Sequence, residues 1–296
     1  MKTTLLTALA AAALAAGCSK SDTGTPCVKI APTIQTRVTG LHFDTGDRIG
    51  LSIAKGSETY AQNVPMTYDG TAFTAADLLW YNDSNEKSTL TAYHPYSEQG
   101  MPAEFSVATD QTSGGASSDL LVAVKKEVTP SSAPVGMLFY HVMSQLTIVV
   151  SNSSSAVVTG VSVGGLVPTA EIDYSMPKAA AKSGVAAAEV KACEVKPGAT
   201  YRAILVPQQA ALTVTVTTDD GRSHTKTLSS AQLESGKRYD MSVVVTNIDI
   251  DVELSGEVVD WGDGGSLDGS GEGGGGDGGG GEGGGEGGDP GTLSYG

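Results

Sequence analysis

Residues that could do chemistry are few in this sequence, and their spacing builds no familiar catalytic or metal site. Four histidines are scattered, and none lies at ligand spacing from another: His42, His94, His141 and His224. The chain also has no C-x-x-C, G-x-S-x-G, H-E-x-x-H or phosphate-loop motif. We therefore expect no catalytic residue, no metal ligand and no cofactor, and interpret each histidine as a strand or turn residue. Because a β-fold can bring distant residues together, a periplasmic hydrolase stays a third alternative.

One cysteine has a different chemistry open to it, because it follows a short apolar segment. Lys2 and the apolar run Leu5–Ala16 have the order and length of an export signal. Small residues then lead directly to Cys18, which resembles the lipobox of bacterial lipoproteins, although Ala15 stands where that pattern prefers Leu. The resemblance implies a signal peptide at residues 1–17 and diacylation of the Cys18 thiol, which gives a stable membrane anchor. An ordinary secretory signal is the alternative.

The two remaining cysteines are candidates for a disulfide, since exported chains often form them. Cys27 and Cys193 lie far apart in the sequence, and Cys27 falls within the expected N-terminal tether. The sequence leaves open whether the two thiols pair or stay unpaired.

The charge of the chain is concentrated at its C-terminal end. The formal net charge is −15, yet residues 249–296 hold 12 acidic and no basic residues, which leaves −3 on the rest. No basic patch is available to neutralise phosphates, so nucleic acid is excluded as a partner. Residues 262–296 contain 20 Gly and almost no apolar side chains, so burial cannot offset their chain entropy. We expect a flexible acidic tail there rather than a calcium β-roll, whose recurring aliphatic residue is missing.

Period-two patterns run through residues 28–259, and helical periodicity is scarce. Turn sequences such as Tyr68-Asp69-Gly70 separate the expected strands. These strands are Arg48–Ala54, Ser88–His94, Glu104–Thr109, Leu120–Val124, Val135–His141, Gln145–Ser151, Val157–Val163, Ala186–Val195, Tyr201–Val206, Leu212–Thr217, Ser223–Leu228 and Arg238–Val245. Many short strands at this spacing indicate β-sandwiches. The Ala-rich stretch 179–188 is a candidate short helix, interrupted by Gly184.

The composition also suggests where the body of the chain divides. Residues 129–134 contain two prolines that block strand pairing, which predicts a linker, while 152–155 is a rival boundary. We expect one domain at 38–128 and another at 135–247, each long enough to bury a core. The other segments are an N-terminal tether with a first strand at 18–37, a separate strand region at 248–261 and the tail at 262–296.

Five segments, in order, resemble motifs of the Bacteroidetes fimbrillin family, whose members are pilus subunits made as lipoprotein precursors. They are Phe43–Leu51, Thr91–Tyr96 (with His94 where the family more often has Tyr), Asp110-Gln111-Thr112 with Ser118–Ala123, Phe139–Ile148, and Tyr239 followed by Val258-Val259-Asp260-Trp261. The match spans residues 38–261. The resemblance implies an all-β protein of two consecutive transthyretin-like β-sandwich domains, followed by the disordered Gly-rich acidic tail.

The same resemblance carries expectations about function. It implies a structural subunit of cell-surface fimbriae that contributes to adhesion and is not an enzyme. The expected location is the bacterial outer membrane and cell surface, reached through the lipid anchor. Expected partners are other fimbrial subunits and host or bacterial surface ligands, with no cofactor.

Family members mature by cleavage after an Arg near the N-terminus, which directs attention to Arg37. It is the only Arg before Arg48, and Arg48 lies in a predicted core strand. Cleavage there would release residues 18–37 with the lipid anchor and free a groove in the first domain. The removed part includes Val28–Ile34, whose apolar residues are in phase for a first strand. The alternative is that Arg37 is an ordinary solvated charge.

The clearest period-two segment is 247–255, and it is a candidate donor strand. Its apolar residues Ile248, Ile250, Val252 and Leu254 alternate with acidic residues. A strand that completes the open sheet of a neighbouring copy binds by β-augmentation, and repetition of such a head-to-tail contact builds a filament. The alternative is that the segment extends the second domain's own sheet. A different class of function, a monomeric surface lipoprotein that binds glycans, would use exposed aromatics such as Trp80-Tyr81.

Overall fold

The computed structural model describes residues 24–35, 42–254 and 259–260. β-strands are the dominant secondary structure of these residues, which confirms the predicted all-β fold. Their one helical turn is a 3-10 turn at Ala116–Ser118. The helix considered at 179–188 is absent, because strand β12 (Lys178–Ala181) and a turn occupy that stretch. Within the described residues, no helix has the length and apolar character needed to cross a membrane.

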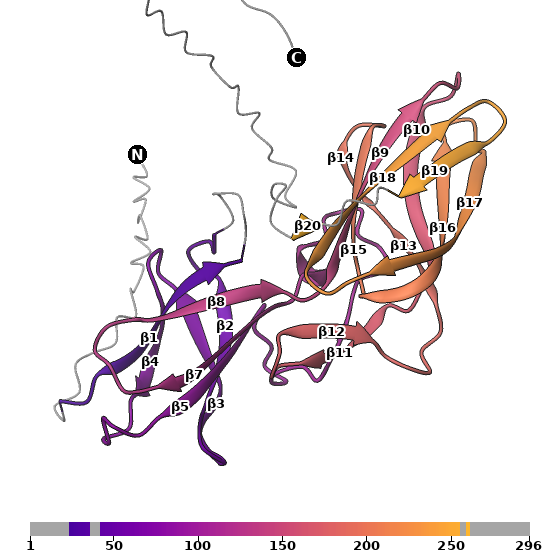
Figure 1. The fold of residues 1–296 in the computed structure, drawn as a ribbon. Helices are drawn as coiled ribbons and strands as arrows, with labels where there is room; N and C mark the ends of the chain where they lie inside the picture. The colour runs from indigo at the N-terminus through magenta and orange to yellow at the C-terminus, as the bar shows by residue number, and fades with distance from the viewer. Residues whose placement is uncertain (1–23, 36–41, 255–258, 261–296) are drawn as a thin grey trace, which may run out of the picture.

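The first unit is a closed β-barrel, drawn mainly in indigo and purple in Figure 1. Around the barrel the order is β1-β4-β3-β2-β5-β7-β8. The bounds are β1 Cys27–Ile34, β2 Arg48–Lys55, β3 Glu58–Tyr68, β4 Phe73–Leu79, β5 Ser88–His94, β7 Leu121–Val128 and β8 Val135–His141. The predicted first β-sandwich is closed into a barrel, because β1 pairs with β4 on one side and with β8 on the other. Apolar side chains of all seven strands fill the interior.

The division between the two units lies after the predicted linker. Residues 129–134 connect β7 to β8, and both of these strands belong to the barrel. The chain passes to the second unit between His141 and Ser144, where β9 begins. The predicted boundary is therefore wrong: the two prolines shape a connection within the barrel. The rival stretch 152–155 joins β9 to β10, which lie in the two sheets of the second unit.

The second unit is a β-sandwich, as predicted. One sheet has the order β14-β15-β9-β18-β19 with β20 also on β18, and the other has the order β13-β10-β16-β17. The bounds are β9 Ser144–Asn152, β10 Val158–Leu166, β13 Ala188–Lys191, β14 Cys193–Lys196, β15 Thr200–Leu205, β16 Gln208–Thr218, β17 Ser223–Leu233, β18 Lys237–Val245, β19 Ile250–Leu254 and β20 Val259–Asp260. Their inward side chains form one apolar core.

A stretch between two barrel strands is bound to the second unit, so the units are not simply consecutive. After β5 the chain forms β6 (Glu104–Ser106), which pairs with β11 (Thr169–Asp173) in a small sheet with β12. Farther along, the buried Gln111 side chain donates to the Ile204 carbonyl at 2.8 Å and accepts from the Ile204 N–H at 2.8 Å. The chain then returns to the barrel at β7. We call residues 104–118 the strap, because they tie the barrel to the sandwich.

Candidate functional site

The first barrel strand, β1, is the candidate functional element, because the predicted processing sites flank it. β1 begins nine residues after Cys18 and ends three residues before Arg37. Both of those residues, the signal peptide and the 262–296 tail lie outside the described residues. A cut at Arg37 would therefore sever β1 from the rest of the barrel.

The hydrogen bonds of β1 are divided unequally between its two neighbours. Five consecutive residue pairs, from Ile30–Val135 to Ile34–Phe139, join β1 in parallel to β8. The antiparallel ladder to β4 has three pairs and an irregularity in its register. Beyond the end of β1, the Gln35 N–H donates to the Phe139 carbonyl at 2.8 Å. β8 is thus the main backbone template for the first strand.

Two side chains of β1 point into the barrel and anchor the strand there. Val28 and Ile30 are both 0% exposed. Burying a side chain of this size is worth about 1.5–3 kcal/mol, so the two together stabilise the closed barrel by roughly 3–6 kcal/mol. Ile30 lies opposite Phe73 of β4, whose ring is 4.9 Å from that of Phe43, centroid to centroid. Removing β1 would uncover this aromatic cluster.

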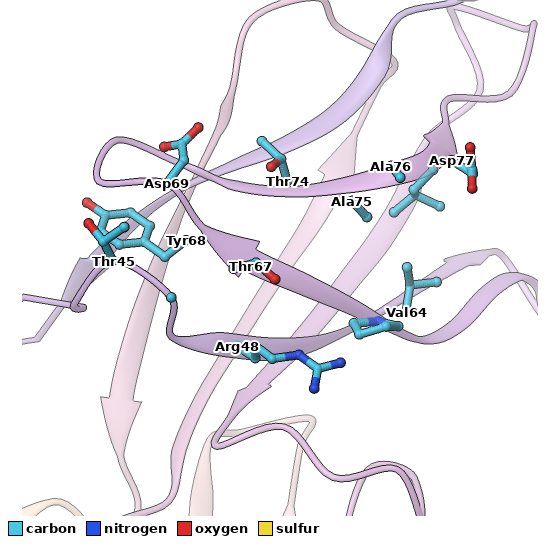
Figure 2. Close-up of a pocket in the computed structure, with 13 residues that line it drawn as sticks. Thr45, Arg48, Val64, Thr67, Tyr68, Asp69, Thr74, Ala75, Ala76 and Asp77 are labelled. Atoms are coloured by element: carbon cyan, nitrogen blue, oxygen red, sulfur yellow. The ribbon is translucent and has the colours of Figure 1, made fainter. Parts of the chain in front are cut away.

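The neighbouring strand β4 is only weakly tied to β3. Their ladder has two pairs, Thr67–Thr74 and Tyr68–Phe73. In the alternation of an antiparallel ladder, the next hydrogen-bonding position on β3 is Pro65, which has no N–H to donate. Figure 2 shows the strands parting from the turn at Asp69. A groove of about 820 Å³ opens between them.

Side chains replace the missing ladder at both ends of this groove. At the open end, the Tyr60 hydroxyl on β3 donates to the Leu79 carbonyl on β4 at 2.7 Å. At the turn, the Asp69 carboxylate accepts the N–H groups of Thr71 and Ala72, each at 2.8 Å. The Ala72 hydrogen bond is the main reason that the pKa of Asp69 is held below its ordinary value. The β3–β4 connection is therefore held by side-chain hydrogen bonds near its two ends rather than by a continuous ladder.

The candidate donor segment forms part of the second unit's own sheet, which was the alternative interpretation of this segment. β19 pairs antiparallel with β18 from Val245–Ile250 to Met241–Leu254. Ile250 is 1% and Val252 7% exposed, both in the core of the second unit, and Leu254 is half-buried. Ile248 precedes the strand and is 90% exposed. β19 is nevertheless an edge strand with one hydrogen-bonded neighbour.

Two interpretations of single residues change with the structure. Trp80 and Tyr81 are 2% and 9% exposed, so the exposed aromatic platform considered for glycan binding is wrong. Their rings pack edge to face, 5.8 Å apart between centroids, in the barrel interior. Cys193 has a free thiol, which excludes a bridge between Cys27 and Cys193.

Sequence reasoning missed one contact between two of the resemblance motifs. Asp119, just before β7, and His141, at the end of β8, approach to 2.9 Å between Oδ1 and Nδ1. Their side chains are 15% and 6% exposed, so this hydrogen bond is largely shielded from water. Both residues lie within segments that resemble fimbrillin motifs, but no periodicity shows which strand ends meet. Within the described ranges, no group of three His, Cys, Asp or Glu is placed to hold a metal ion.

Comparison with known proteins finds solved structures of similar fold and a family whose profile matches the chain. No curated protein matches the sequence. A solved structure from Bacteroides ovatus, provisionally described as a cell adhesion protein, is 20% identical, covers 80% of this chain and 98% of its own, and has a TM-score of 0.67. A similarly described structure from Bacteroides uniformis is 19% identical, with 82% and 100% coverage and a TM-score of 0.66. These likenesses show a shared fold. The profile of the family described as fimbrillin-like matches residues 36–261, and the chain therefore belongs to the fimbrillin-like family.

Proposed function

We propose that the chain is a structural subunit of cell-surface fimbriae, assembled by protease-triggered donor-strand exchange, and that it contributes to adhesion. Membership of the fimbrillin-like family supports a fimbrial structural or adhesive role at the cell surface, in assembly with other subunits. That family is a structural family and not an enzyme family. The observation that carries the finer proposal is that a terminal strand, β1, closes the barrel.

Export and maturation form the first part of this proposal. Cys18 carries the lipid that holds the precursor at the outer membrane, and cleavage after Arg37 releases the mature subunit. The cut separates β1 from the barrel strands, which then present the edges of β4 and β8. Supporting this, β1 ends three residues before Arg37.

The donor strand forms the second part. Ile250 and Val252 in β19 have the same spacing as Val28 and Ile30 in β1, so each pair presents two apolar side chains to one face. Edge strands are the ones available for pairing with another chain. In the assembled fibre, β19 of one copy therefore takes the place of β1 in the next, with Leu254 and Ile248 as flanking contacts.

A reversible lock on β19 tests this assembly mechanism. Ser242 on β18 and Glu253 on β19 lie directly opposite each other and are exposed. Cysteines at both positions (Ser242→Cys with Glu253→Cys, in a Cys193→Ser background) should hold β19 in its own sheet when oxidised. We expect the oxidised protein, cut after Arg37, to stay monomeric in size-exclusion chromatography, and the reduced protein to polymerise.

A matched disulfide elsewhere in the second unit distinguishes the need to release β19 from a general effect of rigidity. Thr213 and Thr227 face each other on β16 and β17, with their hydroxyl oxygens 3.1 Å apart. Cysteines at these two positions should leave polymerisation unchanged under oxidising conditions. Polymer formation by the oxidised β18–β19 lock would refute donation of β19.

Intact-mass analysis of protein from the cell surface tests maturation separately. The proposal requires a precursor with a diacylated Cys18 and a mature chain that begins at residue 38. A mature chain that still carries lipid, or a Cys18 thiol that is bridged to another cysteine, would contradict this part.

A further inference from the structure

The hydrogen bond between Asp119 and His141 lies where β8 changes its backbone hydrogen-bonding partner. Residues 135–139 of β8 pair with β1. Only the last two residues of the strand, Tyr140 and His141, pair with β7. If β1 leaves, five of the seven residues of β8 lose their ladder, and the strand stays attached mainly at its C-terminal end.

Further contacts gather at that same end of β8. The Val142 N–H donates to the Leu120 carbonyl at 3.1 Å and extends the short ladder. From the second unit, the Ser235 hydroxyl donates to the Val142 carbonyl at 2.8 Å. The Asp119–His141 hydrogen bond lies beside these bonds and is well shielded from water. A hydrogen bond in such a place is worth more than one at the surface.

We propose that the Asp119–His141 pair is a positioning contact that keeps β8 in place while the groove between β4 and β8, which β1 fills in this structure, is empty. This inference rests on the proposed function, in which β1 is exchanged for a donor strand. A fixed β8 gives the incoming strand an ordered template, so little ordering entropy opposes binding. Without the pair, the contacts that remain on the polar backbone of β8 among the described residues include the two β7 residue pairs, the neighbouring end contacts and an exposed hydrogen bond from Lys125 Nζ to the Gly136 carbonyl, at 2.7 Å.

Binding of a peptide with the β1 sequence to the full chain measures how well the Asp119–His141 pair positions β8. A site for a specific protease is introduced within residues 36–41, and the chain is cut after folding. A fluorescent peptide with the sequence of residues 24–36 then competes for the groove, with Cys27→Ser in both peptide and chain. Affinity is read by fluorescence anisotropy.

Three substitutions separate positioning from general stability. Asp119→Ala removes the acceptor and should weaken peptide binding about tenfold or more, as expected when a buried polar group loses its partner. Asp119→Asn keeps an oxygen that accepts from His141 Nδ1 and should restore binding to within about twofold. Glu104→Ala breaks the surface ion pair that Glu104, on the strap, makes with Lys182, and it should leave the peptide affinity unchanged. Should Asp119→Ala fail to fold, His141→Phe retains the ring volume and removes the same bond.

The outcomes are distinct. Equal peptide affinity in wild type and in the folded disrupting variant would show that the pair does not position β8 and would overturn the inference. Failure of the cut wild-type chain to bind the peptide would instead refute exchange of β1, and with it the proposed function.

Discussion

Truncating Ile30 should loosen the first strand measurably, because this side chain is fully buried in the barrel. Ile30→Ala removes methyl groups that pack near Phe73 and Val135, the residues paired with it on β4 and β8. Buried Ile-to-Ala changes cost about 2–5 kcal/mol, part of it from the cavity that remains. We expect the free energy of unfolding, measured in urea, to fall by this amount. For a chain of this size the corresponding fall in Tm is about 2–4 °C per kcal/mol.

Hydrogen exchange locates the effect. Amides of β4 and of residues 135–139 should exchange faster in Ile30→Ala, whereas those of β16 in the second unit should keep their protection. Thr33 lies on the same strand but is exposed, so Thr33→Ala is the control and should change stability by less than about 0.5 kcal/mol. A loss below about 1 kcal/mol for Ile30→Ala, or faster exchange spread equally over both units, would refute the anchoring role of Ile30.

Three further changes test other parts of the structure. Gly50→Ala should cost about 1–3 kcal/mol in thermal unfolding, because its Cβ would lie 2.3 Å from a ring carbon of Tyr93, whereas Gly136→Ala meets nothing within 4 Å and should be close to neutral. The pKa of the Asp69 carboxyl is lower in the folded chain than in the unfolded chain, so its contribution to stability is present above the unfolded-state pKa and is lost as pH falls through the folded-state pKa. Urea unfolding over a pH series should show this loss of stability. Asp69→Asn should remove this pH dependence. Gln111→Ala should destabilise the chain by about 1–3 kcal/mol for each buried backbone group that it leaves unsatisfied, as calorimetry can measure, and an unchanged Tm would show that water replaces the side chain.

The sequence predicted strands well where one face of a strand is buried. β18 shows this best, since Tyr239, Met241 and Val243 alternate with exposed residues and its predicted bounds nearly match those observed. β3 and β4 were missed, although the turn between them was recognised. The burial pattern of β3 is irregular, and its ladder to β4 stops at Thr67, before Pro65, so no clear period-two signal exists.

Long-range pairing is the part that the sequence could not reveal. Neither the parallel register of β1 on β8 nor the meeting of Asp119 with His141 leaves a local pattern. The strap shows the same limit, since Gln111 looks like any polar loop residue until its amide reaches β15. The linker predicted at 129–134 failed because prolines end strands equally well within a domain and between domains.

The parallel pairing of β1 with β8 also has a consequence for the order of folding. Ile30 and Val135 are 105 residues apart, so this ladder closes a far longer loop than the hairpins of the barrel. Long loops are slower to close than short ones, and contacts between distant residues are made late. β1 is the first strand of the barrel along the chain, yet the strand beside which it finally lies comes more than a hundred residues later. We expect the other barrel strands to form their hairpins before this ladder closes. A subunit that exchanges its first strand would return to the arrangement through which it folded.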